Sequence, residues 1–173
     1  MSTRSYIFCK CKDGRVRGVF HHWDGYPTGV GQTLRDHYSK SHALVECIMT
    51  LGNIETLREN INETETHAKN RIAQGLSPYL EDNAIEGNSV EDLLKTPDMM
   101  CIEFAYYWDG EDWFCVDLAS EEHQLWSGWV GLTTAIDMYR EYEERNSSVK
   151  PYFIGVDYGV SDKSRTVRYD LYR

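Results

Sequence analysis

The segment from His21 to Pro27 holds the densest group of side chains in this chain that could do chemistry. It reads His-His-Trp-Asp-Gly-Tyr-Pro, and it lies where a strand should end and a helix should begin. Free N–H groups at a helix start favour an anion, and small residues let a ligand approach the backbone closely. A histidine beside such a start can bind or protonate a phosphate or a carboxylate. The candidate ligand-binding residues, for a small anionic ligand, are therefore His21, His22, Asp24, Tyr26, Thr28 and Gly29.

A structural interpretation of the same segment is equally concrete, and from the residue types alone it is favoured. Asp24-Gly25 is typical of a turn, and Pro27 is typical of a helix start. Trp23 and Tyr26 would then close the hydrophobic core. Turn residues recur for conformational reasons, so both interpretations stay open.

No metal site or cofactor is predicted, and no catalytic residue is assigned. Adjacent residues on a strand point to opposite faces, so His21 and His22 do not converge on one ion. One histidine with Asp24 supplies two ligands, whereas zinc sites use three or four. Cys9 and Cys11 lack a second pair at suitable spacing, and we interpret them as small buried hydrophobes.

The segment just before this run predicts a β-hairpin, with Asp13-Gly14 as a two-residue turn. That turn pairs Cys9 with Gly18 and Ile7 with Phe20. It assigns one core face to Ile7, Cys9, Cys11, Val16, Phe20 and His22. It also puts Ser5 across from His22, which we interpret as a structural hydrogen-bonded pair rather than a catalytic one.

The rest of the chain predicts a single α+β domain over residues 1–173, with a mainly antiparallel sheet built from three hairpins and about four helices. Helices are expected over Val30–Tyr38, Ala43–Leu51 and 133–142, with short ones over Ile54–Asn60, 69–73 and from Ser89 to Pro97. The later hairpins pair Met100–Tyr107 with Trp113–Leu118, and Tyr152–Tyr158 with Thr166–Tyr172.

Length and composition limit the classes of protein to which the chain can belong. At 173 residues, of which 41% are hydrophobic, the chain is long enough to bury one real core. No segment approaches about 18 consecutive apolar residues, and no apolar leader follows a basic start, so we expect a cytoplasmic protein without membrane contact. Five scattered cysteines fit a reducing compartment better than a disulfide framework.

The net charge of −10 is concentrated in one quarter of the chain. Residues 81–122 hold thirteen Asp and Glu but only one basic residue, Lys95, for a net −12. Direct nucleic-acid binding is therefore not expected there. The stretch is either a solvated acidic face or, with its aromatic residues, a surface that docks a basic protein. The candidate partner-binding residues are Asp109, Glu111, Asp112, Trp113, Glu121 and Glu122, with the aromatic residues Tyr106, Tyr107, Trp108, Trp126 and Trp129 nearby.

The first 38 residues resemble a family of short proteins encoded in phage and prophage genomes. The similarity rests on the Thr3-Arg4-Ser5 start, the Asp13-Gly14 hairpin, and His22-Trp23-Asp24-Gly25-Tyr26-Pro27 followed by Gly29-Val30-Gly31. A helix ending in His37-Tyr38 completes it. The resemblance implies a phage origin and no particular activity. The two cysteines of the first strand and the acidity of residues 81–122 depart from the family pattern.

Two functional hypotheses follow. In the first, the protein is a non-enzymatic phage accessory protein that acts in the host cytoplasm. It binds and inhibits a basic host protein, such as a defence-system component, through the acidic, aromatic-rich stretch. In the second, it is a small-molecule or nucleotide-binding protein, or a hydrolase, with an anion site at His21–Gly31. A structural or regulatory role within the phage is a third reading.

Overall fold

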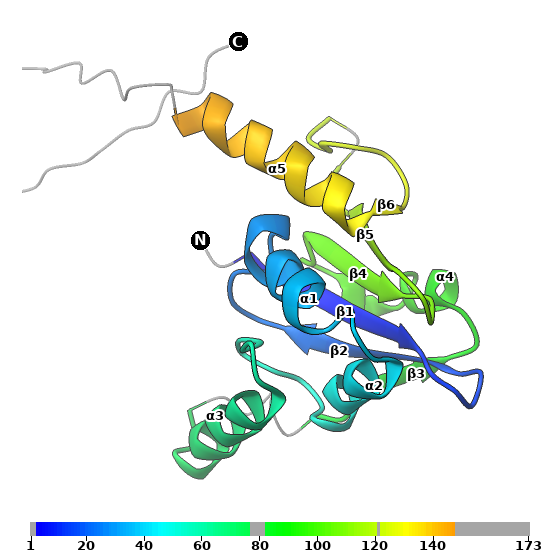
Figure 1. The fold of residues 1–173 in the computed structure, drawn as a ribbon, viewed down its shortest axis with the longest axis vertical. Helices are drawn as coiled ribbons and strands as arrows, with labels where there is room; N and C mark the ends of the chain where they lie inside the picture. The colour runs from blue at the N-terminus through cyan, green and yellow to red at the C-terminus, as the bar shows by residue number, and fades with distance from the viewer. Residues whose placement is uncertain (1–2, 77–81, 121, 148–173) are drawn as a thin grey trace, which may run out of the picture.

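The computed structural model describes residues 3–76, 82–120 and 122–147, and these form the α+β domain that the sequence predicts (Figure 1). One mixed sheet has the order β3-β2-β1-β4-β5-β6. Its strands are β1 (Ser5–Lys10), β2 (Val16–His21), β3 (Ile85–Gly87), β4 (Phe104–Trp108), β5 (Trp113–Asp117) and β6 (Val130–Gly131). The helices are α1 (Gln32–His37), α2 (His42–Thr50), α3 (Ile61–Ala73), α4 (Val90–Leu93) and α5 (Leu132–Ser147), with a π-helical turn η1 (Pro27–Gly31) and a 3₁₀ turn η3 (Pro97–Met99).

The centre of the sheet is a parallel pair that the sequence did not predict. β1 runs parallel to β4, with Ser5 opposite Phe104 and Cys9 opposite Trp108. The other four strand pairings are antiparallel, so the sheet is mainly antiparallel, as expected. The predicted hairpin over Tyr152–Tyr158 and Thr166–Tyr172 lies outside the described residues.

The register predicted for the first hairpin is wrong by one residue. Phe8, not Cys9, lies opposite Gly18, and Ile7 lies opposite Val19. The loop has three residues rather than two: the Cys11 N–H donates to the Arg15 carbonyl, and Gly14 takes a φ of +84°. A glycine in this conformation ends a three-residue hairpin loop. Because side chains alternate along a strand, the shift moves every β2 side chain to the other face.

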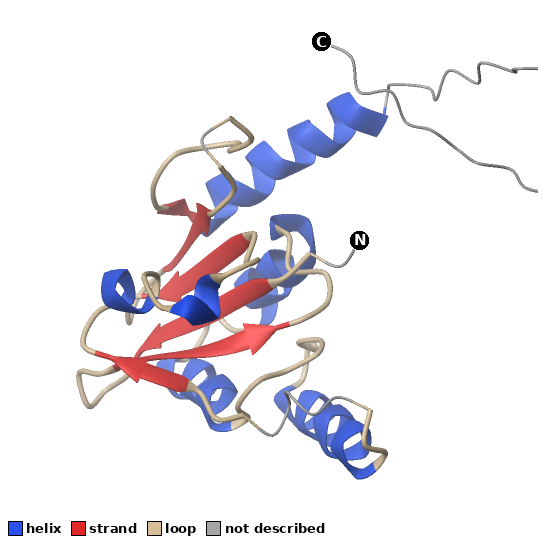
Figure 2. Cartoon of the chain, turned by 180° about the vertical axis from the view of Figure 1, so that it is seen from behind, coloured by secondary structure: helices blue, strands red, loops and turns tan. Residues whose placement is uncertain are grey.

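Two hydrophobic clusters cover the two faces of the sheet. On the front, η1, α1, α2 and α5 pack over β1, β4 and β5 around a core that includes Ile7, Val19, Leu34, Ile48, Tyr106 and Ile136. Among the described residues, the back carries only short helices, α4 and η3, over a smaller cluster that includes Tyr6, Phe8, Val16, Leu93 and Val116 (Figure 2). The back of the sheet is therefore thinly covered.

Most of the predicted helices are confirmed. α2 and α5 lie close to their predicted ranges, and the Ser89 hydroxyl caps α4 by accepting from the Asp92 N–H at 3.2 Å. α3 is longer than predicted and begins after Asn60, whose side chain accepts from the Asn62 N–H. No described helix has the length and apolar character needed to cross a bilayer.

The helix predicted over Ile54–Asn60 is wrong. Ile54 forms a parallel bridge with His21, and its carbonyl accepts from the His22 N–H at 3.1 Å. The Glu55 carbonyl accepts from the Trp23 N–H at 2.8 Å. Tertiary pairing with the end of β2 therefore holds this segment extended.

Candidate functional site

His21, at the end of β2, is fully buried and forms a hydrogen-bonded pair with Ser5. Its Nε2 accepts a hydrogen bond from the Leu57 N–H at 3.2 Å, so the ring proton resides on Nδ1, which lies 3.3 Å from the Ser5 hydroxyl. Burial, together with the smaller effect of the neighbouring His22, lowers the pKa of His21 to about 3. Ser5 is also fully buried. The pair therefore holds the core together, and a neutral, enclosed imidazole is unsuited to acid–base chemistry at neutral pH.

The sequence paired Ser5 with His22, and the register shift explains the correction. His22 lies on the opposite face of the strand, as alternation predicts. Its ring meets Trp23 edge-on at a centroid distance of 4.5 Å and Phe20 at 5.8 Å. Burial lowers the pKa of His22, and the Arg4 guanidinium adds to the effect. The two adjacent histidines therefore belong to different surroundings.

The turn after the histidines is tied to the strands on either side of it. Asp24 has a φ of +57°, a conformation that Asp tolerates better than most residues. Gly25 donates to the Thr3 carbonyl, and its own carbonyl accepts from the Tyr106 hydroxyl at 2.8 Å. A Cβ on Gly25 would lie 2.8 Å from the Thr3 carbonyl oxygen, so only glycine fits. These contacts support the structural interpretation of the Asp-Gly-Tyr-Pro segment.

The start of η1 offers few free hydrogen-bond donors to an anion. The N–H groups of Gly29 and Val30 already donate to the carbonyls of Tyr26 and Asp24, both at 2.9 Å. The Thr28 hydroxyl donates to Glu143 at 2.9 Å, and the Tyr26 hydroxyl lies 3.3 Å from the Asp24 carboxylate. Two carboxylates therefore face the place where the sequence predicts a negative ligand.

Four of the six predicted ligand residues nevertheless line one pocket. Its volume is about 180 Å³, and its walls include His21, Asp24, Tyr26 and Gly29 with Leu57. His22 and Thr28 are not part of it. The volume is below the roughly 300–1,000 Å³ typical of small-molecule sites, so the pocket has room only for a small group.

The predicted partner-binding residues do not form one patch. Asp109, Glu111 and Asp112 lie at the tip of the β4–β5 hairpin, where the Asp109 carboxylate accepts from the N–H groups of both other residues at 2.9 Å. Glu122 comes after the other end of β5, a strand about 17 Å long at roughly 3.3 Å per residue. Glu121 lies outside the described residues.

Most of the aromatic residues expected at that surface are in the core instead. Trp113 is 5% exposed, and Tyr106, Trp108 and Trp126 are also buried. Asp117, one of the thirteen acidic residues, is buried too, and its carboxylate accepts from the Ala119 and Leu125 N–H groups. We predicted these residues at the surface because the sequence alone does not show which face of a strand meets the helices.

A smaller surface does combine acidic and aromatic side chains. We call it the acidic aromatic patch, and it consists of Tyr107, Phe114, Trp129, Glu91 and Asp109. The first three are half-buried on the back of the sheet, where Tyr107 pairs with Phe114 across β4 and β5 and lies 5.8 Å from Trp129. Burial raises the pKa of Tyr107, and the nearby Asp109 and Glu91 carboxylates raise it further. Acidic and aromatic side chains thus meet on the thinly covered face. Strand alternation around Tyr107 was the available signal for this patch.

Cys9 and Cys11 are buried in the core, as interpreted, and burial raises the pKa of the Cys9 thiol. Within the described ranges, no group of three His, Cys, Asp or Glu side chains converges as metal ligands would.

The described residues form an α+β domain with a mixed six-stranded sheet, and the acidic aromatic patch lies on the back of that sheet. Comparison with known proteins finds no matching family model, no matching curated protein and no matching solved structure. The phage resemblance of the first 38 residues therefore remains a prediction.

Proposed function

We propose that this protein is a non-catalytic binding protein that docks a basic protein partner through the acidic aromatic patch. The observation that carries the proposal is the meeting of half-buried Tyr107, Phe114 and Trp129 with Glu91 and Asp109 on the back of the sheet. Aromatic side chains anchor protein interfaces, and charge steers the encounter. The net charge of −12 over residues 81–122 favours a basic partner.

The phage resemblance supplies the context for this proposal. A phage accessory protein with such a surface would inhibit a basic host protein in the host cytoplasm, and a defence-system component is the first candidate. The buried state of Ser5 and His21 supports a binding role, because the described residues offer no accessible nucleophile–histidine pair in that region.

Neutralising the patch without disturbing the fold tests the proposal. Asp109→Asn keeps the side-chain oxygen that caps the hairpin tip, and Glu91→Gln removes an exposed charge. With a partner recovered from host lysate by affinity capture, we expect the double variant to weaken its binding about tenfold, or about 1.4 kcal/mol. The loss should shrink at high salt, because exposed charges are then screened.

A matched control removes the same charge elsewhere. Glu59→Gln with Asp137→Asn neutralises two exposed acids outside the patch. This control should bind like the parent protein. Equal loss in both double variants would mean that net charge alone matters, and unchanged binding in the patch variant would overturn the proposal.

The alternative, a small-molecule, nucleotide-binding or hydrolytic protein with its site at His21–Gly31, has one favourable observation. Four predicted residues line the pocket of about 180 Å³. Two carboxylates and the occupied N–H groups weigh against an anion there. His22→Ala that abolished a ligand-dependent activity in a folded protein would favour this alternative.

A further inference from the structure

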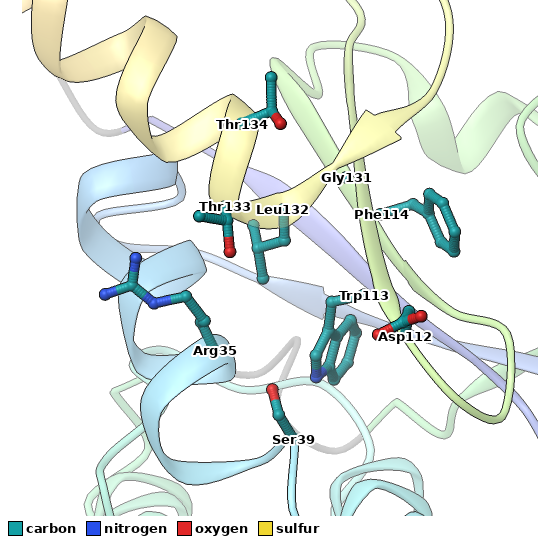
Figure 3. A pocket seen from close by; sticks show the side chains of 9 residues that line it. All are labelled: Arg35, Ser39, Asp112, Trp113, Phe114, Gly131, Leu132, Thr133 and Thr134. Atoms are coloured by element: carbon teal, nitrogen blue, oxygen red, sulfur yellow. The ribbon is translucent and has the colours of Figure 1, made fainter.

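A second, larger pocket lies on the front of the molecule, where α5 begins. Its volume is about 380 Å³, within the range of small-ligand sites (Figure 3). α1 contributes Arg35, the bend that follows it contributes Ser39, and β5 contributes Trp113. The remaining lining residues are Asp112, Phe114, Gly131, Leu132, Thr133 and Thr134. Phe114 also belongs to the acidic aromatic patch, and its ring points away from Trp113 (Figure 3).

The indole N–H of Trp113 has no acceptor among the described residues. Trp113 is 5% exposed, and its Nε1 is buried. The neighbouring Trp108 shows the usual solution, because its Nε1–H donates to His42 Nδ1 at 3.2 Å. A buried donor without a partner costs about 1–3 kcal/mol. Figure 3 shows the Trp113 nitrogen on the side of the ring that faces Ser39 and Arg35, into the pocket.

The start of α5 adds further donors at the same place. The first N–H groups of a helix have no partner within it, and the helix dipole makes that end positive. No acidic residue lies in the first turn of this 16-residue helix. The Thr133 and Thr134 hydroxyls lie at the same end.

Arg35 is the one basic residue among the described residues of the lining; Figure 3 shows its guanidinium pointing away from Trp113, so pairing with an anion there requires another rotamer of this partly exposed side chain. Its Nε donates to Asp36 at 2.8 Å, and its two terminal nitrogens have no ion-pair partner within the described part of the chain. Asp112 is the one carboxylate in the lining and lies on the far side of Trp113 in Figure 3. The pocket therefore offers several hydrogen-bond donors and one basic residue against a single carboxylate. The start of η1, in contrast, faces two carboxylates.

We propose that this pocket binds a small molecule through an oxyanion, a carboxylate or a phosphate, that accepts from Trp113 Nε1–H and from the start of α5 and pairs with Arg35. Leu132 and the Trp113 ring form the apolar wall against which the rest of the ligand packs. The pocket shares Phe114 with the acidic aromatic patch but otherwise uses different residues. It adds a ligand to a protein whose net charge of −10 would otherwise repel anions.

Nuclear magnetic resonance of the indole N–H groups tests this site directly. The protein, labelled with ¹⁵N at tryptophan, is titrated with inorganic phosphate or with acetate at constant ionic strength, and Trp113→Phe assigns the resonance. We expect a saturable shift of the Trp113 N–H with a Kd of the order of 1 mM, modest because an isolated anion makes few contacts. Saturation by phosphate alone identifies a phosphate ligand, and saturation by acetate alone identifies a carboxylate.

Trp126 provides an internal control, because its indole N–H is also buried without an acceptor among the described residues but lies outside the pocket. Its resonance should not move. Arg35→Met should weaken anion binding at least fivefold, and Asp112→Asn should strengthen it. Arg145→Met, at the other end of α5, should leave the Kd unchanged. No saturable Trp113 shift, an equal shift of Trp126, or an unchanged Kd in Arg35→Met would overturn the proposal.

Discussion

The side chain of His21 is neutral because the fold encloses it, and this has a measurable consequence in acid. The pKa of His21 is about 3 in the folded protein against 6.5 for an exposed histidine. Between these values the unfolded chain binds a proton that the folded protein does not. Stability contributed by His21 is therefore full above pH 6.5 and declines as the pH falls towards 3, by up to about 1.4 kcal/mol per pH unit.

His21→Gln should flatten this pH dependence, because glutamine cannot be protonated. The variant should be less stable at pH 7 by about 1–3 kcal/mol, since the contacts to Ser5 and Leu57 are altered, but its unfolding free energy should fall less steeply between pH 6.5 and 4. Urea unfolding at several pH values measures both effects. His123→Gln, at an exposed position, is the control and should keep the parent slope.

Gly25 leads to a second expectation at the residue scale. Its missing side chain lets the turn lie against the backbone of Thr3 and Ser5, with 2.8–2.9 Å to the place of a Cβ. Gly25→Ala should therefore cost about 1–3 kcal/mol, because backbone must move. Gly131→Ala, where a Cβ meets nothing within 4 Å, should change stability by no more than about 0.5 kcal/mol. Thermal unfolding of the two variants makes the comparison, and equal costs would contradict this account.

At the scale of elements, α3 lies away from the sheet and is tied to it by one buried carboxylate (Figure 1). Glu55 is 5% exposed, forms an ion pair with Arg71 (Nε at 2.8 Å), accepts a hydrogen bond from Arg71 Nη2 at 2.9 Å, and lies 3.1 Å from His67 Nε2. Both basic residues belong to α3. The extended segment that pairs with β2 therefore also holds this helix in place.

Glu55→Gln should loosen α3 and leave the sheet intact. Removing one partner of a buried ion pair costs about 3–5 kcal/mol, and partial exposure of Arg71 and His67 reduces this to about 1–3 kcal/mol. Hydrogen exchange should rise across α3 while β1 amides stay protected. Glu65→Gln breaks only the exposed pair with Lys69 and should not raise exchange. Faster exchange in β1 as well would show that α3 is not an independent unit.

Sequence periodicity predicted the elements that local residues determine. Ser89, Gly52 and the apolar stripe from Ala135 mark helix ends and faces, and the two Asp-Gly hairpins form at the expected places. It missed what depends on distant contacts. The parallel pairing of β1 with β4 joins residues 99 apart, and the pairing of Ile54 with His21 overrides local helix preference. The one-residue error at Gly14 then moved His21 and Phe20 to the wrong faces.

The candidate site at His21–Gly31 was likewise predictable only where local residues determine its structure. The Asp-Gly-Tyr-Pro segment revealed a turn before a helix, but only the fold shows that its N–H groups are occupied. The larger pocket at the start of α5 could not be predicted, because Arg35, Trp113 and Thr133 come from three distant segments. Their residue types carry no local pattern that links them.

On the scale of the whole molecule, the central parallel pair sets the order in which the fold can be completed. β1 lies between β2, which is next in the chain, and β4, which is about 99 residues away. Long-range pairing carries a large loop-closure cost before any contact compensates it. The domain cannot be completed until the second half of the chain is present.

Refolding from urea should therefore take milliseconds to seconds rather than microseconds. Buried Trp108 and Trp113 report the β4–β5 end of the core in stopped-flow fluorescence. The rate should not depend on protein concentration, since the slow step is within one chain. A microsecond phase that recovers the full signal would contradict this expectation.

The two outermost strands, β3 with three residues and β6 with two, have a consequence for how other chains can attach. A long exposed edge offers a row of backbone donors and acceptors that another strand can extend, and very short edges deny it. Among the described strands, the long ones (β1, β2, β4 and β5) are all paired on both sides. Binding of a partner by strand addition is thereby disfavoured, and a partner must bind through side-chain contacts. The same geometry protects this aromatic-rich sheet from stacking edge to edge with copies of itself.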